Sequence, residues 1–130
     1  MTPRLLLRLE GLALLAVSTT AYFALGGTAG WFAALLLAPD LSMLGYLAGP
    51  RVGAAAYNAA HTQLGPLALG ALALGAGPPS LLLGGLIWAA HIGLDRALGY
   101  GLKHASGFHH THLGPSHAHA HARARRQPTP

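Results

Sequence analysis

The chain has 130 residues, of which 52% are hydrophobic and only 8% are charged, with three acidic residues and no cysteine. A soluble domain normally has about a quarter charged residues, so this composition indicates an integral membrane protein whose partner is the lipid bilayer. The absence of cysteine excludes disulfides, thiolate metal sites and a cysteine nucleophile. The net charge of +5 does not indicate binding to nucleic acid, because the basic residues lie at the ends of apolar segments and in the C-terminal tail, without interleaved aromatic residues.

The first apolar segment resembles a secretory signal peptide, because Arg4 and Arg8 precede it. Glu10 interrupts the expected apolar core, no convincing small-x-small cleavage site comes before Trp31, and further apolar segments follow. The sequence therefore predicts a retained membrane helix over about residues 5–25, followed by a glycine-rich turn.

Polar residues interrupt the second and third apolar segments, about residues 31–48 and 52–75. In the second, Pro39 removes a backbone donor and Asp40 follows it near mid-span, where an ionisable group is costly and usually has a use. In the third, His61 shares a helix face with Asn58, and Pro66 exposes the carbonyl of Thr62. These segments predict two membrane helices that each carry a polar site.

The fourth segment, about residues 81–102, has two different faces. His91 and Asp95 lie one helical turn apart on one face, and Trp88 lies a turn before them. Small residues line roughly the opposite face, and such a stripe permits a close helix contact or a homo-oligomer. The stripe consists of Gly85, Ala89 and Gly93.

These segments predict an all-α polytopic membrane protein with four transmembrane helices in an antiparallel bundle, residues 1–103. Residues 104–114 are expected to form a membrane-proximal cytoplasmic segment, and residues 115–130 a disordered tail rich in His and Arg. The basic residues fall on one side of a four-span topology, and the turns at 26–30 and 75–80 hold no charge. Both termini are therefore expected to be cytoplasmic, in the cell (cytoplasmic) membrane.

The spans place four ionisable side chains at similar depth, and we expect them to meet in one cavity open to the cytoplasm. Imidazole and carboxylate suit a divalent transition metal such as zinc, and a water bound to that metal would be a hydrolytic nucleophile. A proton-sharing or hydrogen-bond network without metal, and unconnected structural roles, are the alternatives. The candidate catalytic or metal-binding residues are Asp40, His61, His91 and Asp95, and the candidate supporting residues are Glu10, Tyr57, Asn58, Arg96, Tyr100 and His112.

Three function classes follow from this cluster. The first is a membrane enzyme, such as a metal-dependent hydrolase, the second is a proton- or ion-linked small carrier, and the third is a structural or assembly protein. The sequence identifies neither a substrate nor a reaction.

Several motifs of the chain strongly resemble the domain of unknown function 4260 family, over about residues 4–114. The resemblance implies a small bacterial-type membrane protein and supplies no reaction. The single turn from His91 to Asp95 is also similar to a helix of families labelled membrane-bound metal-dependent hydrolases, although that match is short. The motifs are Arg8-Leu-Glu-Gly11, residues 38–51, Tyr57-Asn58 with His61-Thr62, residues 90–103, and Gly107-Phe108 with residues 111–114.

Overall fold

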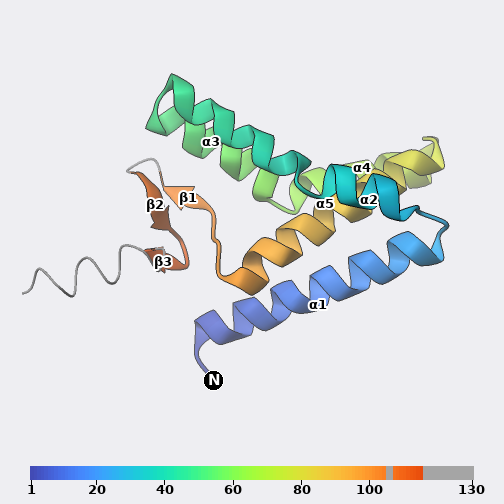
Figure 1. Cartoon of the computed structure of the whole chain (residues 1–130), viewed down its shortest axis with the longest axis horizontal. Helices are drawn as coiled ribbons and strands as arrows, with labels where there is room; N and C mark the ends of the chain where they lie inside the picture. The colour runs from blue at the N-terminus through green and yellow to red at the C-terminus, as the bar shows by residue number, and fades with distance from the viewer. Residues whose placement is uncertain (105–106, 116–130) are drawn as a thin grey trace, which may run out of the picture.

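The computed structural model describes residues 1–104 and 107–115, and the predicted disordered tail falls almost wholly outside them. The chain is mainly helical, as predicted (Figure 1). The described elements are α1 (Pro3–Ala24), α2 (Ala29–Leu36), the 3-10 helix η1 (Ala38–Ala48), α3 (Pro50–His61), α4 (Leu64–Gly75), α5 (Pro79–Leu98), β1 (Lys103–His104), β2 (Gly107–Thr111) and β3 (Gly114–Pro115).

The helices follow one another along the molecule in successive passes, formed by α1, by α2 with η1, by α3 with α4, and by α5, and Figure 1 shows the turns after α1 and α4 at one end. Two of these passes are not single helices, because α2 continues as η1 and α3 is followed by α4 in a new direction. The predicted bundle of four continuous helices is therefore not confirmed. Among the described residues, three segments are long and apolar enough to cross a membrane, and α4 is a shorter apolar helix; the three are Pro3–Ala24, Ala29–Ala48 and Pro79–Leu98.

The second pass tightens into a 3-10 helix at Pro39, whose ring removes the amide donor that an α-helix would use there. A run of 11 residues in this form is unusually long. With three residues per turn, side chains three apart are eclipsed, so Asp40, Met43 and Tyr46 fall on one side. The tighter helix thus keeps Asp40 on the same side as the ring of Tyr46, which packs over Gly53 of α3.

The third pass breaks between His61 and Leu64. Thr62 is extended, and Pro66 in the first turn of α4 has no amide with which to continue the ladder of α3. Side chains of α5 satisfy two of the carbonyls left at the end of α3. The indole of Trp88 donates to the carbonyl of Ala60, and the guanidinium of Arg96 donates to that of His61 at 3.1 Å.

Helix α5 is the core of the molecule, because it packs against α1, α2 and α4 and carries half of the buried helical residues. A Cβ atom on Gly93 would lie 2.6 Å from the backbone nitrogen of Leu15 in α1, and one on Gly85 would lie 3.2 Å from the carbonyl oxygen of Pro66. The small-residue stripe is thus covered by helices of the same chain. The homo-oligomer through Gly85, Ala89 and Gly93 stays a prediction, and it would require α1 or α4 to move aside.

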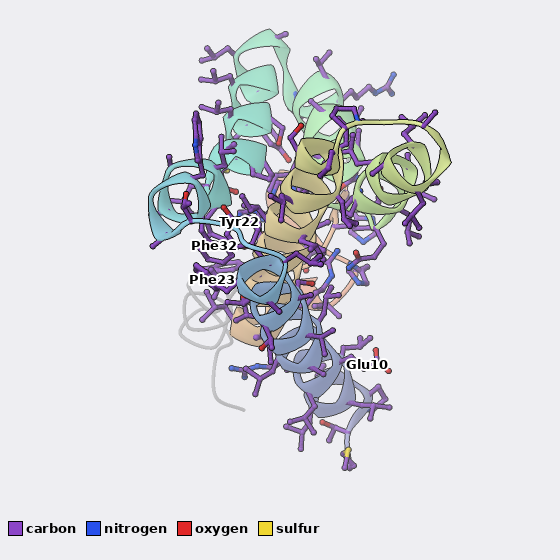
Figure 2. The ribbon with its side chains drawn as sticks, turned by 90° about the vertical axis from the view of Figure 1, so that its right-hand side faces the viewer. Glu10, Tyr22, Phe23 and Phe32 are labelled. Atoms are coloured by element: carbon purple, nitrogen blue, oxygen red, sulfur yellow. The ribbon has the colours of Figure 1, made fainter. Side chains whose placement is uncertain are left out.

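Aromatic rings hold the turn between α1 and α2, as Figure 2 shows. The rings of Tyr22, Phe23 and Phe32 lie with their centroids 5.1 to 5.4 Å apart. The hydroxyl of Tyr22 donates to the carbonyl of Thr28 at 2.9 Å, which fixes the turn. This contact places the start of α2 beside α1 without any charged residue.

The segment after α5 adds three short strands to the helical chain. They form a small antiparallel sheet in the order β1-β2-β3, within the region predicted as a membrane-proximal segment. Gly99 ends α5 in the left-handed conformation (φ 94°), which turns the chain back toward α3. The strands lie near η1 and α3, at the end of the molecule opposite the two uncharged turns (Figure 1).

Candidate metal centre

The structure brings Asp40, His61, His91 and Asp95 together from η1, α3 and α5. One ligand atom from each side chain lies within 4.8 Å of the others. The two histidine Nε2 atoms are 3.0 Å apart. Oδ1 of Asp40 lies 3.2 Å from Nε2 of His61 and 3.3 Å from Nε2 of His91. Oδ2 of Asp95 lies 3.5 and 3.7 Å from the same two nitrogens.

These separations have the size of a metal coordination shell. Zinc binds histidine nitrogen and carboxylate oxygen at about 2.0 to 2.2 Å, so the edges of a tetrahedral site are roughly 3.3 to 3.6 Å long. The five distances, 3.0 to 3.7 Å, lie on both sides of that length. The arrangement therefore fits a single ion between the four atoms.

The backbone of α3 fixes the orientation of His61. Its Nδ1 lies 2.7 Å from the carbonyl oxygen of Tyr57, which can only accept, so Nδ1 carries the proton and Nε2 presents a lone pair to the cluster. The imidazole also stacks on the ring of Tyr57, with centroids 3.7 Å apart. Histidines that bind metals commonly donate their second nitrogen to a carbonyl in this way.

His91 and Asp95 complete the cluster from α5. Both histidine rings are fully buried, and the hydroxyl of Tyr57 donates to Oδ2 of Asp95 at 3.1 Å. No described protein atom bonds Nδ1 of His91, which is also buried. The carboxylate oxygens of Asp40 and Asp95 and Nε2 of His61 are acceptors that face one another. Nε2 of His91 is a fourth acceptor unless it carries a proton, and one proton there can serve only one or two of the other three.

A polar hollow of about 270 Å³ lies beside the cluster. The carboxyl of Asp40 is 33% exposed, so it is the most accessible of the four groups. The ammonium of Lys103 lies 5.0 Å from the centre of the Tyr57 ring. Burial lowers the pKa of Lys103, and the charge of Asp95 partly offsets this effect. The hollow is lined by Asp40, Met43, Tyr57, Asp95, Tyr100 and Lys103.

The supporting residues predicted from the sequence do not all lie at the cluster. Tyr57 contacts the cluster directly, Tyr100 lines the hollow, and Arg96 binds the carbonyls of His61 and Tyr100. Glu10 is not part of the cavity, because it lies on the exposed side of α1 (Figure 2).

Asn58 and His112 are also outside the cluster, and both instead hold the segment after α5. The amide of Asn58 donates to the carbonyl of Lys103 at 2.7 Å and accepts from its N–H at 2.6 Å. Nδ1 of His112 accepts from the N–H of Leu102 at 2.8 Å. Asn58 shares a helix face with His61, but its partner comes from the C-terminal segment.

Sequence reasoning missed the site roles of Trp88, Met43 and Lys103. The signal for Trp88 was its place one turn before His91, and Gly65 leaves the space that its ring fills. The 3-10 geometry that aligns Met43 with Asp40 has no sequence signal beyond Pro39. Lys103 looked like an ordinary basic residue at the end of a span, and only the fold shows that it is buried.

The fold and the site together define a helical protein with three membrane-length apolar segments and a buried histidine–aspartate cluster in its interior. Residues 4–115 match the family described as Domain of unknown function (DUF4260), so the chain belongs to that family. Neither the curated proteins nor the solved structures gave a match to the chain.

Proposed function

We propose that the protein is a metal-dependent membrane hydrolase whose ion is bound by Asp40, His61, His91 and Asp95. The observation that carries the proposal is the approach of four potential ligand atoms to within 4.8 Å of one another, with five of their separations between 3.0 and 3.7 Å. Without a cation, one proton on Nε2 of His91 would satisfy only one or two of the other three atoms, and the remaining acceptors would repel one another. A divalent transition metal such as zinc relieves that repulsion and suits this mixture of ligands.

The accessible side of the cluster supports a reaction with water. A bound metal acidifies a water molecule and so supplies a nucleophile near neutral pH. The hollow beside Asp40 has room for this water and for part of a substrate. Asp40 directs Oδ1 to the histidines, which leaves Oδ2 to accept the proton of the water. In a carboxylic or phosphate ester, the water oxygen would bond to the carbonyl carbon or the phosphorus, the bond from that atom to the leaving oxygen would break, and the proton held by Asp40 would pass to the leaving oxygen.

Elemental analysis of the full-length protein in detergent tests the metal. The tail residues His117, His119 and His121 are replaced by Ala in every sample, because they are potential ligands outside the cluster. We expect about one zinc or similar ion per chain, lost in His91→Ala and in Asp40→Asn. His104→Ala is the matched control, since this histidine is exposed, and it should keep the ion. Metal-free protein, or equal metal in all variants, would refute the site.

A proton- or ion-linked carrier is the second candidate. The observation that favours it is the contact of His91 with both Asp40 and His61, through which one proton can be shared. A metal-free protein whose cluster binds or releases a proton during transport would support this candidate. The test of metal content therefore separates the two functions.

We also propose that the protein spans the cytoplasmic membrane with both termini on the cytoplasmic side. The proposal depends on the basic residues, which avoid the turns after α1 and α4. Reporters fused after Thr28 or Pro79 should lie outside, and fusions at Pro50 or the C-terminus should lie in the cytoplasm. A cytoplasmic signal from Pro79 would contradict this topology.

A further inference from the structure

An apolar groove runs between α2 and α5 toward the cluster. It consists of two hollows, of about 330 and 280 Å³, which share Leu35, Gly84 and Ile87 and are therefore continuous. Trp31 and Ser80 lie at its far end, and Pro39 and Trp88 lie at its near end. Eight residues of helix separate the two ends on α5, so the groove is roughly 12 Å long.

The groove, the cluster and the polar hollow follow one another along α5. Pro39, at the near end of the groove, directly precedes Asp40, and Trp88 lies about one turn before His91. On the other side of the cluster, the polar hollow extends from Asp95 to Lys103. The apolar groove on one side of the cluster and the polar hollow on the other fit an amphiphilic molecule.

The charges around the hollow favour an anionic head group. Asp40 and Asp95 line the hollow with two negative charges and Lys103 with one positive charge, and Arg96, which is outside the lining, adds a second positive charge that interacts electrostatically with Asp95. A divalent cation at the cluster would leave two positive charges in excess. A phosphate ester carries one or two negative charges and suits such a surplus.

Resting on the proposed metal site, we infer that the substrate is a single-chain lipid with a phosphate head group. Its hydrocarbon chain lies in the groove between α2 and α5, and its phosphate lies in the hollow beside Lys103. The near end of the groove is lined by Pro39 and Trp88, which lie, respectively, next to Asp40 in the sequence and about one helical turn before His91, so the chain of a bound lipid would point toward the cluster. The experiment must distinguish this substrate from bulk lipid that simply fills the groove.

Binding of dodecyl phosphate to the full-length protein in dodecyl maltoside micelles tests the inference. Both amphiphiles have the same chain, so any saturable binding above the micelle background reports the head group. Trp31 and Trp88 line the two ends of the groove, and their fluorescence provides the signal. Methyl phosphate, which has no chain, is the second probe and is followed by its effect on the melting temperature.

Two variants separate the chain from the head group. Gly84 lines both hollows and has open space beside it, so Gly84→Leu fills the groove without a backbone clash. It should weaken dodecyl phosphate binding by about tenfold, roughly the loss of two buried methylene groups, and leave methyl phosphate binding unchanged. Gly70→Leu is the matched control, since Gly70 also faces open space but lies outside the groove, and it should bind both probes normally. Lys103→Met should weaken both probes.

The inference is overturned if dodecyl phosphate gives no saturable change above dodecyl maltoside, or if Gly84→Leu binds it as the parent does. Metal content measured on the same samples keeps the two proposals apart. Bound metal without a preference for phosphate refutes only the lipid substrate. Selective binding of dodecyl phosphate to metal-free protein supports the groove and refutes the metal-dependent hydrolase.

Discussion

The contact between α1 and α5 at Gly93 gives the most direct test of the packing. In Gly93→Ala the new Cβ would lie 2.6 Å from the backbone nitrogen of Leu15 and 2.7 Å from the carbonyl oxygen of Gly11, whereas ordinary contacts begin near 3.4 Å. Both neighbours are backbone atoms, so α1 must move away by roughly 0.8 Å. Overpacking of this kind costs about 1 to 3 kcal/mol.

Gly84→Ala is the matched control, because it changes the same helix and nothing lies within 4 Å of its new Cβ. Both variants gain roughly 0.5 to 1 kcal/mol of helix propensity, so the difference between them isolates the clash. We expect Gly93→Ala to melt about 3 to 10 °C below Gly84→Ala in detergent, followed by tryptophan fluorescence. Equal melting temperatures, or a higher one for Gly93→Ala, would show that α1 does not pack on α5 at this position.

Three further predictions concern the surroundings of the cluster. Asn58→Leu removes both hydrogen bonds to the backbone of Lys103 and should destabilise the segment after α5 by about 1 to 3 kcal/mol. The backbone amide of Lys103 should then exchange its hydrogen faster, and unchanged exchange would show that Asn58 does not hold this segment. Burial and the charge of a nearby arginine lower the pKa of His112, so its contribution to stability is present above about pH 6.5 and is lost as the pH falls through the lowered value. The melting temperature should therefore fall less on acidification in His112→Asn, which keeps an acceptor for the N–H of Leu102. An equal fall in both proteins would show that protonation of His112 does not destabilise the fold. Tyr57→Phe removes a hydrogen bond to a carboxylate of the cluster and should weaken metal binding by about tenfold in a metal titration, with Tyr100→Phe as the unchanged control.

The sequence alone indicated the membrane-type composition, the approximate positions of the three apolar segments that are long enough to cross a membrane, and the four residues that the structure brings together. Each depends on local information. Charged residues are so costly in an apolar segment that Asp40, His61, His91 and Asp95 are conspicuous wherever they point, and helix periodicity places His91 and Asp95 on one face. The family resemblance also depended on the order of residues alone, and the family match agrees with it.

Only the tertiary structure decided how the passes bend and what the remaining polar residues contact. The 3-10 form of residues 38–48 and the break after His61 are accompanied by close contacts at Gly45, Gly53 and Gly65, and a sequence does not show which neighbour fills the space beside a glycine. Asn58 illustrates the same limit, because its face points toward the site but its partner is 45 residues away. Local periodicity fixes the face of a helix on which a residue lies, whereas long-range packing fixes what that face meets.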